Sequence, residues 1–218
     1  MDPVIIGLTG LYCAGKNRVA ALLEKRGVPV LDVDKLGHAA LESEKAAIVQ
    51  RFGNGVLAPD GLVDRRALAE IVYSGKAHGR PESRNGGLAD LEAIIHPAVN
   101  VLTDRWIEDA ARGGVSVVPA GLCVVNAALL HRSGAFCRLR ALIVVKAPFL
   151  VRLYRARKRD MVPVGELFRR FRSQAAFNSQ YFAAKTDIYT INNSGFSGSG
   201  TNLEKCVDEI LSRIREKL

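Results

Sequence analysis

The chain has 218 residues, of which 48% are hydrophobic and 24% are charged, which suits one compact domain with an inserted subdomain. It has no apolar run near the roughly 20 residues that cross a bilayer, and no basic start with a long apolar segment as in a secretory signal, so we expect a cytoplasmic protein without a membrane partner. The net charge of +9 is concentrated in residues 152–159 and 168–172 without any nucleic-acid-binding signature, so we expect no nucleic-acid partner.

The first predicted elements are a strand, a glycine turn and a helix. Val4–Thr9 predicts a buried strand, and Asn17–Lys25 predicts a helix. Between them, the spacing of Gly10, Gly15 and Lys16 is typical of a loop that binds nucleotide phosphates. The backbone N–H groups of this loop would point into the turn, where the helix N-terminus adds to their attraction for an anion, and Lys16 would reach the β- and γ-phosphates. The predicted binding residues are Gly10, Leu11, Tyr12, Cys13, Ala14, Gly15, Lys16 and Asn17.

One residue of this loop, Asn17, departs from its usual composition, and another, Cys13, brings a thiol into it. Asn17 stands where Ser or Thr normally gives its hydroxyl to Mg²⁺, although the carbonyl oxygen of Asn17 could serve as a weak metal ligand. Helix N–H groups could lower the pKa of Cys13, but we favour a small residue that fits a tight turn over a redox role. The four cysteines are scattered without paired metal spacing, which favours reduced thiols.

Two acids follow the second predicted strand, residues 27–32. Asp32 and Asp34 are two residues apart, so both could face the γ-phosphate if the extended conformation persists through Asp34. One carboxylate could then accept a proton from an attacking hydroxyl while the other orients water, metal or substrate. The alternative is that Asp34 only caps the next helix, and we favour a catalytic role for one of the two acids.

The middle of the chain is almost entirely helical. We predict helices over residues 35–42, 46–52, 63–72 and about 88–112, with loops at 53–61 and 74–87. The last of these helices should be interrupted near His96 and Pro97, because proline disfavours helix in the residue before it. Residues 36–112 therefore predict an insertion over the strand ends, where ligands bind in parallel sheets.

Strands and helices alternate again in the C-terminal half. Strands are predicted at 122–126, 140–145 and 188–191, and helices at 149–159, 164–172, 173–185 and 202–217. This alternation without close hairpin pairs predicts an α/β fold with a parallel sheet covered on both faces. The core would comprise residues 1–35, 113–148 and 186–218.

The basic runs lie on the predicted helices of residues 149–185. They are either solvated helix faces or a lid over polyphosphate, and the phosphate loop favours the lid. Arg155 and Arg159 are four residues apart and share one helix face, while Arg170 and Arg172 could add a second contact.

Across about Val4 to Leu211 the chain resembles the dephospho-coenzyme A kinases. The acid pair after the second strand, followed by His96-Pro97 about sixty residues later, separates that family from other small phosphate-loop kinases. The elements that stand in the family's order are residues 6–10, Gly15-Lys16, 30–34, 95–97, 124–130, 144–148, 153–155, Arg159-Asp160, Gln174 and 191–195.

The resemblance implies a fold, a reaction and cofactors. It implies a three-layer kinase fold with a five-stranded parallel sheet, a helical acceptor-binding insertion and a helical lid. The implied reaction is ATP-dependent phosphorylation of the ribose 3′-hydroxyl of dephospho-CoA, the last step of coenzyme A synthesis, with Mg²⁺ as cofactor. ATP and dephospho-CoA are the expected partners, and the protein is expected to be a monomer or a weak homo-oligomer.

The resemblance also implies roles for single residues. Asp34 matches the proposed general base, and Lys16 and Arg159 match the phosphate-stabilising cations. Asp32 lies at the entrance of the acceptor region, and the turn containing Asn193 matches the segment near adenine. For His96, a buried histidine that satisfies the helix break is favoured over proton transfer.

Three residues depart from the family pattern. Asn17 replaces the hydroxyl ligand, Asn126 replaces an acid at the end of the third strand, and Asn192 replaces an Asp. The first two changes reduce the charge available to hold Mg²⁺. A kinase of another small acceptor, and a nucleotide-binding regulatory protein that has lost phosphotransfer, are the alternatives left open.

Overall fold

A computed structural model of the protein describes residues 4–74, 86–112, 122–162, 164–172, 186–195 and 200–217. Over these residues the chain is mixed α/β and contains a sheet of five parallel strands. The chain divides into two compact units, one formed by Met1–Asp32 and Trp106–Leu218 and the other by Val33–Arg105. No helix in the described ranges is long and apolar enough to cross a membrane.

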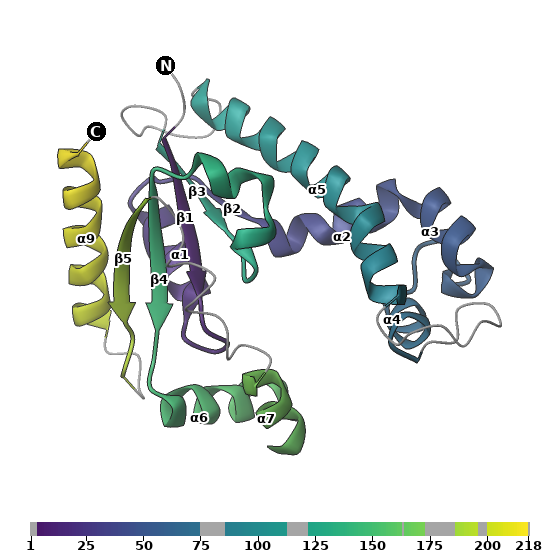
Figure 1. The fold of residues 1–218 in the computed structure, drawn as a ribbon. Coiled ribbons are helices and arrows are strands. Elements are labelled where there is room, and N and C mark those ends of the chain that lie inside the picture. The colour runs from purple at the N-terminus through teal and green to yellow at the C-terminus, as the bar shows by residue number, and fades with distance from the viewer. Residues whose placement is uncertain are drawn as a thin grey trace. The chain divides into compact units, whose positions relative to one another are not determined.

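The sheet lies in the first unit and has β1 (Val4–Gly10) at its centre. β3 (Leu122–Asn126) and β4 (Ala141–Lys146) flank β1, while β2 (Val30–Asp32) lies beyond β3 and β5 (Asp187–Asn192) beyond β4 (Figure 1). In the register of the strands, Asn126 pairs with both Leu8 and Asp32. The carboxyl ends of β1, β2 and β3 therefore meet at one edge of the sheet, where the loop after β1 begins.

Both faces of the sheet are covered, as expected for this fold class. On one face, Ile6 and Leu8 of β1 belong to a core that includes Leu23 of α1 (Lys16–Lys25) and Val207 of α9 (Gly200–Glu216). On the other face, a Cβ atom added at Gly7 would lie 2.6 Å from Leu130 Cδ2, so the leucine side chains that pack there would have to shift to admit a larger residue. Leu130 begins η2 (Leu130–Arg132), which is followed by η3 (Gly134–Arg138).

Two further helices of the first unit follow β4. α6 (Phe149–Asp160) ends at Met161, which has a left-handed φ of 50°, and α7 (Val164–Arg172) follows. The helix predicted over residues 173–185 lies outside the described residues, as does most of the loop predicted at 74–87.

The second unit is helical, as the sequence predicts. It contains α2 (Val33–Ser43), α3 (Lys45–Phe52), η1 (Asn54–Val56), α4 (Arg65–Ser74) and most of α5 (Gly86–Ala111). Its own core consists of apolar residues from α3, η1 and α4 and from the segment between them, which explains why these short helices form a separate compact unit. The core residues are Ile48, Phe52, Val56, Val63, Leu68 and Val72.

The predicted interruption near His96 and Pro97 is wrong. α5 is a single helix of 26 residues, and Pro97 lies inside it. A proline removes only one donor from the helical ladder, and the side chain of Pro97 is exposed. The many remaining bonds and the packing of α5 outweigh this loss. His96 is therefore an ordinary half-buried helical residue and does not satisfy a break in the helix.

Candidate active site

The loop after β1 has the backbone of an anion-binding turn. The Ala14 amide donates to the carbonyl of Leu11 at 2.9 Å, and α1 then begins at Lys16. Two residues of the turn, Cys13 and Gly15, have left-handed φ values of 58° and 97°. Successive amides in such a turn, followed by the start of a ten-residue helix, attract negatively charged groups.

Arg155 and Asn193 hold the carbonyl groups of this loop from one side. The Arg155 guanidinium donates to the carbonyl oxygens of Cys13 at 3.4 Å and of Ala14 at 3.1 Å. The Asn193 side-chain amide, which is buried, donates to the same Ala14 carbonyl at 2.8 Å. Because the C=O and N–H of a trans peptide point in opposite directions, the Gly15 N–H points away from both side chains. The two residues thus fix which side of the loop presents its amides.

Arg155 also holds the turn after β5. Its guanidinium donates to the carbonyl of Asn193 at 3.2 Å and to that of Gly195 at 2.7 Å. The Asn193 backbone amide donates in turn to the carbonyl of Lys146, at the end of β4. Arg155 and Asn193, both expected at the ATP site, therefore lie behind the phosphate loop and support it.

The two glycines of the loop are required by close contacts. A Cβ atom added at Gly15 would lie 2.3 Å from Asn193 Nδ2, and one added at Gly10 would lie 2.8 Å from the carbonyl oxygen of Val145. The neighbour at Gly10 is backbone, and the φ of Gly15 is unfavourable for any residue with a side chain. Both positions therefore need glycine for steric reasons.

Asn126 and Asp32 lie side by side at the carboxyl edge of the sheet, where they are paired in register. Asn126 is 1% exposed, and its Oδ1 atom has no hydrogen-bond partner among the described residues. Leaving a buried acceptor unpaired costs about 1–3 kcal/mol, so this oxygen favours the arrival of a donor. The edge beside the phosphate loop thus offers an acceptor to a bound water, a metal-bound water or a substrate hydroxyl.

Asp34 differs from Asp32 in its local structure. The extended conformation ends at Asp32, and Asp34 lies in the first turn of α2, where its side chain is exposed. The condition for both acids to share one strand face is therefore not met, because α2 begins at Val33. Asp34 and His96 both belong to the second unit, whereas Asp32 belongs to the first.

Arg159 and Arg170, predicted as lid cations, share one carboxylate. Asp160 accepts from Arg159 Nε at 2.6 Å and from Arg170 Nη1 at 3.3 Å. The Tyr12 hydroxyl of the phosphate loop donates to the same carboxylate, and the Arg159 guanidinium lies 5.2 Å from the centroid of the Tyr12 ring. Sequence reasoning assigned no role to Asp160 or to the Tyr12 side chain. The adjacent Arg159-Asp160 pair was a local signal for Asp160, but the sequence carried none for the Tyr12 side chain.

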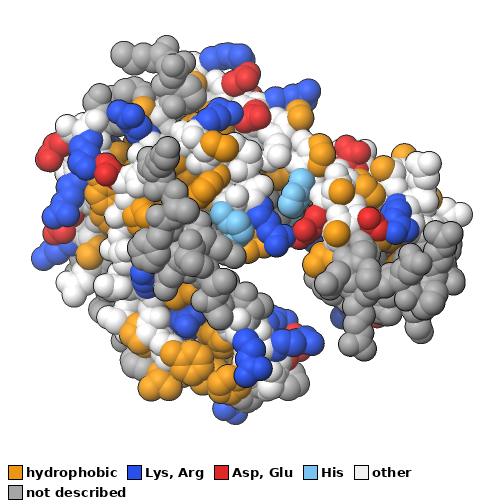
Figure 2. All heavy atoms as spheres, in the orientation of Figure 1, with side chains coloured by type: hydrophobic (Ala, Val, Ile, Leu, Met, Phe, Trp, Pro, Cys, Tyr) orange, Lys and Arg blue, Asp and Glu red, His pale blue; other side chains and the backbone are white. Residues whose placement is uncertain are grey.

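The outer faces of α6 and α7 carry apolar side chains bordered by lysine and arginine (Figure 2). Phe149 and Phe168 are 40% and 51% exposed, and their rings lie 6.0 Å apart. The predicted basic face of these helices is therefore mixed in character: Arg170 contacts the loop residue Tyr12, whereas Arg172 is exposed.

The environment of Cys13 makes its thiol less acidic than usual. Burial raises the pKa of Cys13, and the nearby Arg159, Arg152, Arg155 and Arg170 only partly oppose this effect. The expectation that helix amides could lower this pKa is therefore not met, because desolvation of the half-buried thiol is the larger effect. The thiol stays protonated at neutral pH, in agreement with the favoured interpretation of Cys13 as a small turn residue.

Metal-ligating side chains do not gather in the described ranges. No group of three or more His, Cys, Asp or Glu residues there could hold a metal ion by itself. The start of α1 and the carboxyl ends of β2 and β3 carry oxygen-bearing side chains, those of Asn17, Asp32 and Asn126. A divalent ion at this place would depend mainly on nucleotide oxygens and water for its ligands.

Comparisons with known proteins agree on one family. The family model described as dephospho-CoA kinase matches residues 4–197. The dephospho-CoA kinase of Geobacter sulfurreducens is 32% identical over 212 residues, covering 96% of this chain and 98% of that protein. The dephospho-CoA kinase of Anaeromyxobacter dehalogenans is 36% identical over 214 residues, covering 97% and 92%.

Solved structures give the same result for the fold. The protein TT1252 from Thermus thermophilus has a TM-score of 0.74 at 31% identity, covering 100% of this chain and 99% of that one. A dephospho-CoA kinase from Campylobacter jejuni has a TM-score of 0.61 at 18% identity, covering 98% of each chain, and supports the fold alone.

Proposed function

The chain belongs to the dephospho-CoA kinase family, and we propose that it transfers the γ-phosphoryl group of ATP to the ribose 3′-hydroxyl of dephospho-CoA. ATP-dependent kinase activity is what the family implies, and the acceptor is the part that the proposal adds. The main observation in favour of this proposal is the structure of the phosphate loop. Arg155 and Asn193 bind its carbonyl groups on one side, so that its amide groups face the opposite side.

The phosphate loop and the cations would bind and orient the triphosphate. The loop amides and the start of α1 would surround the β-phosphate, while the Lys16 ammonium would neutralise charge on the β- and γ-phosphates. Arg159 would approach the γ-phosphate from the lid formed by α6 and α7. Because phosphoryl transfer depends mainly on positioning and charge stabilisation, these contacts would lower the barrier.

An acid beside the acceptor would complete the reaction. Asp34 would accept the proton of the 3′-hydroxyl while the hydroxyl oxygen forms its bond to the γ-phosphorus. The bond from that phosphorus to the oxygen bridging to the β-phosphate would break, so that ADP leaves and coenzyme A is formed. We assign Asp32 and His96 to acceptor binding, with the unit Val33–Arg105 as the acceptor region.

Magnesium fits the oxygen-bearing residues at the sheet edge, although weakly. When bound with ATP, Mg²⁺ would neutralise part of the negative charge on the phosphates. Asn17 and Asp32 could contribute oxygen ligands. Asn126 Oδ1, which has no partner within the described ranges, could accept a hydrogen bond from a metal-bound water. These residues supply a single carboxylate, so we expect weaker metal binding than at a site with two.

The same neutral residues support a second candidate, a nucleotide-binding regulatory protein that has lost phosphotransfer. Asn17 and Asn126 favour it, whereas the presence of Lys16, Asp32 and Asp34 favours the kinase, because a pure binder has no need of the acids. For the kinase we propose a cytoplasmic location and a monomer or weak homo-oligomer as the acting species.

The test is an assay of purified protein with ATP, Mg²⁺ and dephospho-CoA that follows ADP and coenzyme A formation. We expect turnover, and we expect Asp34→Asn to lower it by a factor of about 10²–10⁴ while ATP binding is kept. Asp109→Asn, which changes an exposed acid of α5, is the matched control. ATP binding without formation of coenzyme A would favour the regulatory protein, and turnover only with another acceptor would replace the proposed substrate.

A further inference from the structure

We propose that the Tyr12 side chain is a positioning residue: acting through Asp160, its hydroxyl holds Arg159 and Arg170 at the phosphate loop before the nucleotide binds. The inference rests on the proposed function, because it assigns these arginines to the phosphates of ATP. It concerns the side chain of Tyr12, whereas the sequence indicated only the backbone of this residue.

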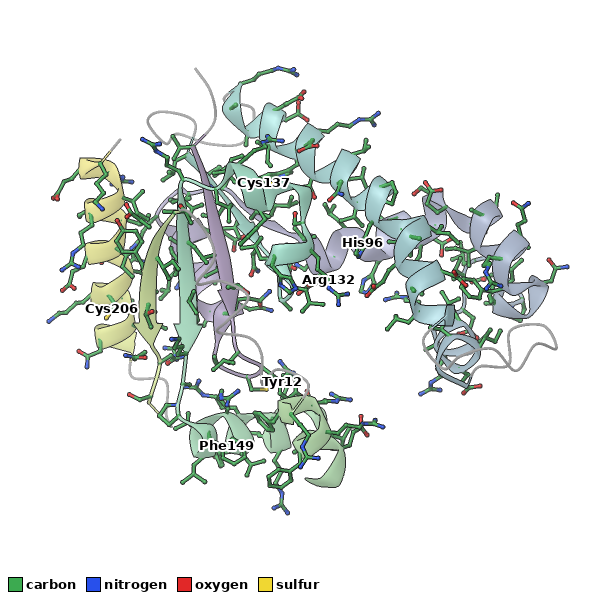
Figure 3. The ribbon with its side chains drawn as sticks, in the orientation of Figure 1. Tyr12, His96, Arg132, Cys137, Phe149 and Cys206 are labelled. Atoms are coloured by element: carbon green, nitrogen blue, oxygen red, sulfur yellow. The ribbon has the colours of Figure 1, made fainter. Side chains whose placement is uncertain are left out.

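Tyr12 connects the phosphate loop to both α6 and α7 (Figure 3). Its hydroxyl donates to Asp160 at the end of α6 and accepts from Arg170 Nη1 of α7 at 3.2 Å. Its ring packs against that of Phe171 of α7 in a T-shaped arrangement, with ring centroids 5.4 Å apart, and the guanidinium of Arg159 lies over the Tyr12 ring. A single side chain of the loop thus contacts both helices of the proposed lid.

Asp160 is the group through which the Tyr12 hydroxyl acts on the arginines. Its side chain is 13% exposed, while those of Arg159 and Arg170 are 60% and 40% exposed. Bonds to this carboxylate are therefore less weakened by solvent than an ordinary surface ion pair. The Tyr12 hydroxyl adds a donor from the loop itself, which fixes the carboxylate, and with it both guanidinium groups, relative to the phosphate site.

This arrangement has a consequence for catalysis that simple packing would not have. A free arginine side chain loses much rotational freedom when it contacts a phosphate, and this loss opposes binding. An arginine already held near its working position avoids most of that cost, so its charge stabilises the transition state more effectively.

The Tyr12 hydroxyl is not needed to hold either neighbouring element together. Arg170 also bonds Glu166 within α7 at 2.6 Å, and the phosphate loop is supported by Arg155 and Asn193. Loss of the hydroxyl should therefore leave the loop and α7 folded while weakening the link between them.

The first test is Tyr12→Phe, which removes the hydroxyl and keeps the ring. We expect kcat to fall about tenfold, with the KM for dephospho-CoA unchanged and the melting temperature lowered by only a few degrees, because one hydrogen bond to a charged group is lost. Tyr154→Phe removes the same atom from a tyrosine of α6 that is 52% exposed, and it should leave kcat at the wild-type value. Wild-type kcat and wild-type ATP affinity in Tyr12→Phe would overturn the inference.

The second test is a double-mutant cycle with Arg159→Ala. If Tyr12 acts through Arg159, most of the effect of Tyr12→Phe on kcat and on the Kd for ATP should vanish in the Arg159→Ala background. Persistence of the full effect in that background would show that the hydroxyl does not act through Arg159, and would contradict the inference.

The Kd measurements separate this inference from the proposed function. They use ATP without an acceptor, so they can be made even if the wild-type protein fails to phosphorylate dephospho-CoA. Failure of the acceptor assay together with a coupled Tyr12–Arg159 cycle would refute the substrate and support the inference. Turnover of dephospho-CoA together with additive effects of Tyr12→Phe and Arg159→Ala would support the substrate and refute the inference.

Discussion

Gly15 is the residue at which the phosphate loop tolerates least change. Its φ of 97° and the 2.3 Å contact that a Cβ atom would make with Asn193 Nδ2 are two separate obstacles to a side chain. Relief of the contact would move Asn193 and break its bond to the Ala14 carbonyl. Changes at Gly15 should therefore disturb the loop and its support together.

We predict that Gly15→Ala lowers ATP affinity by more than about tenfold, because the loop must leave its left-handed conformation or displace Asn193. The measurement is the Kd for ATP by calorimetry. Gly37→Ala is the control: apart from the backbone of its own helix, no described atom lies within 4 Å of its added Cβ, and α2 should gain about 1 kcal/mol in stability. Equal ATP affinity in Gly15→Ala and wild type would contradict this account of the loop.

The buried Asn126 Oδ1, for which the described part of the chain offers no hydrogen-bond donor, leads to a prediction about metal dependence. Asn126→Asp would add a buried negative charge that repels the triphosphate alone and favours its complex with Mg²⁺. The ratio of the ATP Kd without Mg²⁺ to that with Mg²⁺ should rise about tenfold. Asn54→Asp adds the same charge at an exposed position of η1 and should leave the ratio unchanged. An unchanged ratio in Asn126→Asp would place Asn126 away from the metal.

Individual residues were predictable where the signal lay within a few positions of the chain. The spacing of Gly10, Gly15 and Lys16 is sufficient to indicate a phosphate loop, since it reflects the local needs of a turn. The link between Tyr12 and Asp160 spans 148 positions and depends on how α6 folds back on the loop. The sequence could not show the raised pKa of Cys13 for a similar reason, because burial, its main cause, depends on the folded structure.

At the scale of elements, Arg155 joins α6, the phosphate loop and the turn after β5. It makes five hydrogen bonds to groups of Cys13, Ala14, Asn193 and Gly195. A planar guanidinium can donate in several fixed directions, whereas an ammonium cannot reproduce this pattern. The position of α6 relative to the loop should therefore depend on arginine at this position.

We predict that Arg155→Lys weakens ATP binding nearly as much as Arg155→Ala, by at least about tenfold, since either change leaves loop carbonyls without their donor. Thermal unfolding and the Kd for ATP provide the measurements. Arg157→Lys alters an exposed arginine of the same helix and should have no effect on either. Full function of Arg155→Lys would mean that charge alone is required.

Most elements were predictable because their apolar periodicity is local. The helices at α1, α3 and α7 begin and end within two residues of expectation. β2 is shorter than predicted, with three residues, because strand length is set by its pairing with β3 and not by its own sequence. α5 passes through Pro97 because packing along a long helix outweighs one missing bond. The roles proposed for Asp34, Lys16 and Arg159 remain predictions.

For the whole molecule, the net charge of +9 should influence how quickly its anionic substrates arrive. We predict that kcat/KM for ATP falls several-fold when the ionic strength rises from about 0.01 M to about 0.3 M, since screening shortens the range of the attraction. kcat should change much less, because bound phosphates lie close to their cations. Steady-state kinetics over a salt series, with the melting temperature as a control for stability, provide the measurement. A salt-independent KM would show that the excess charge lies away from the approach to the site.

The hydrogen bond from the Asn193 side chain to the Ala14 carbonyl has a consequence for folding during synthesis. The two residues are 179 positions apart, so a nascent chain displays its phosphate loop long before the asparagine that supports it has been synthesised. During translation the loop therefore lacks the hydrogen bond from Asn193. Tight nucleotide binding should begin only when β5 has emerged from the ribosome and joined the sheet.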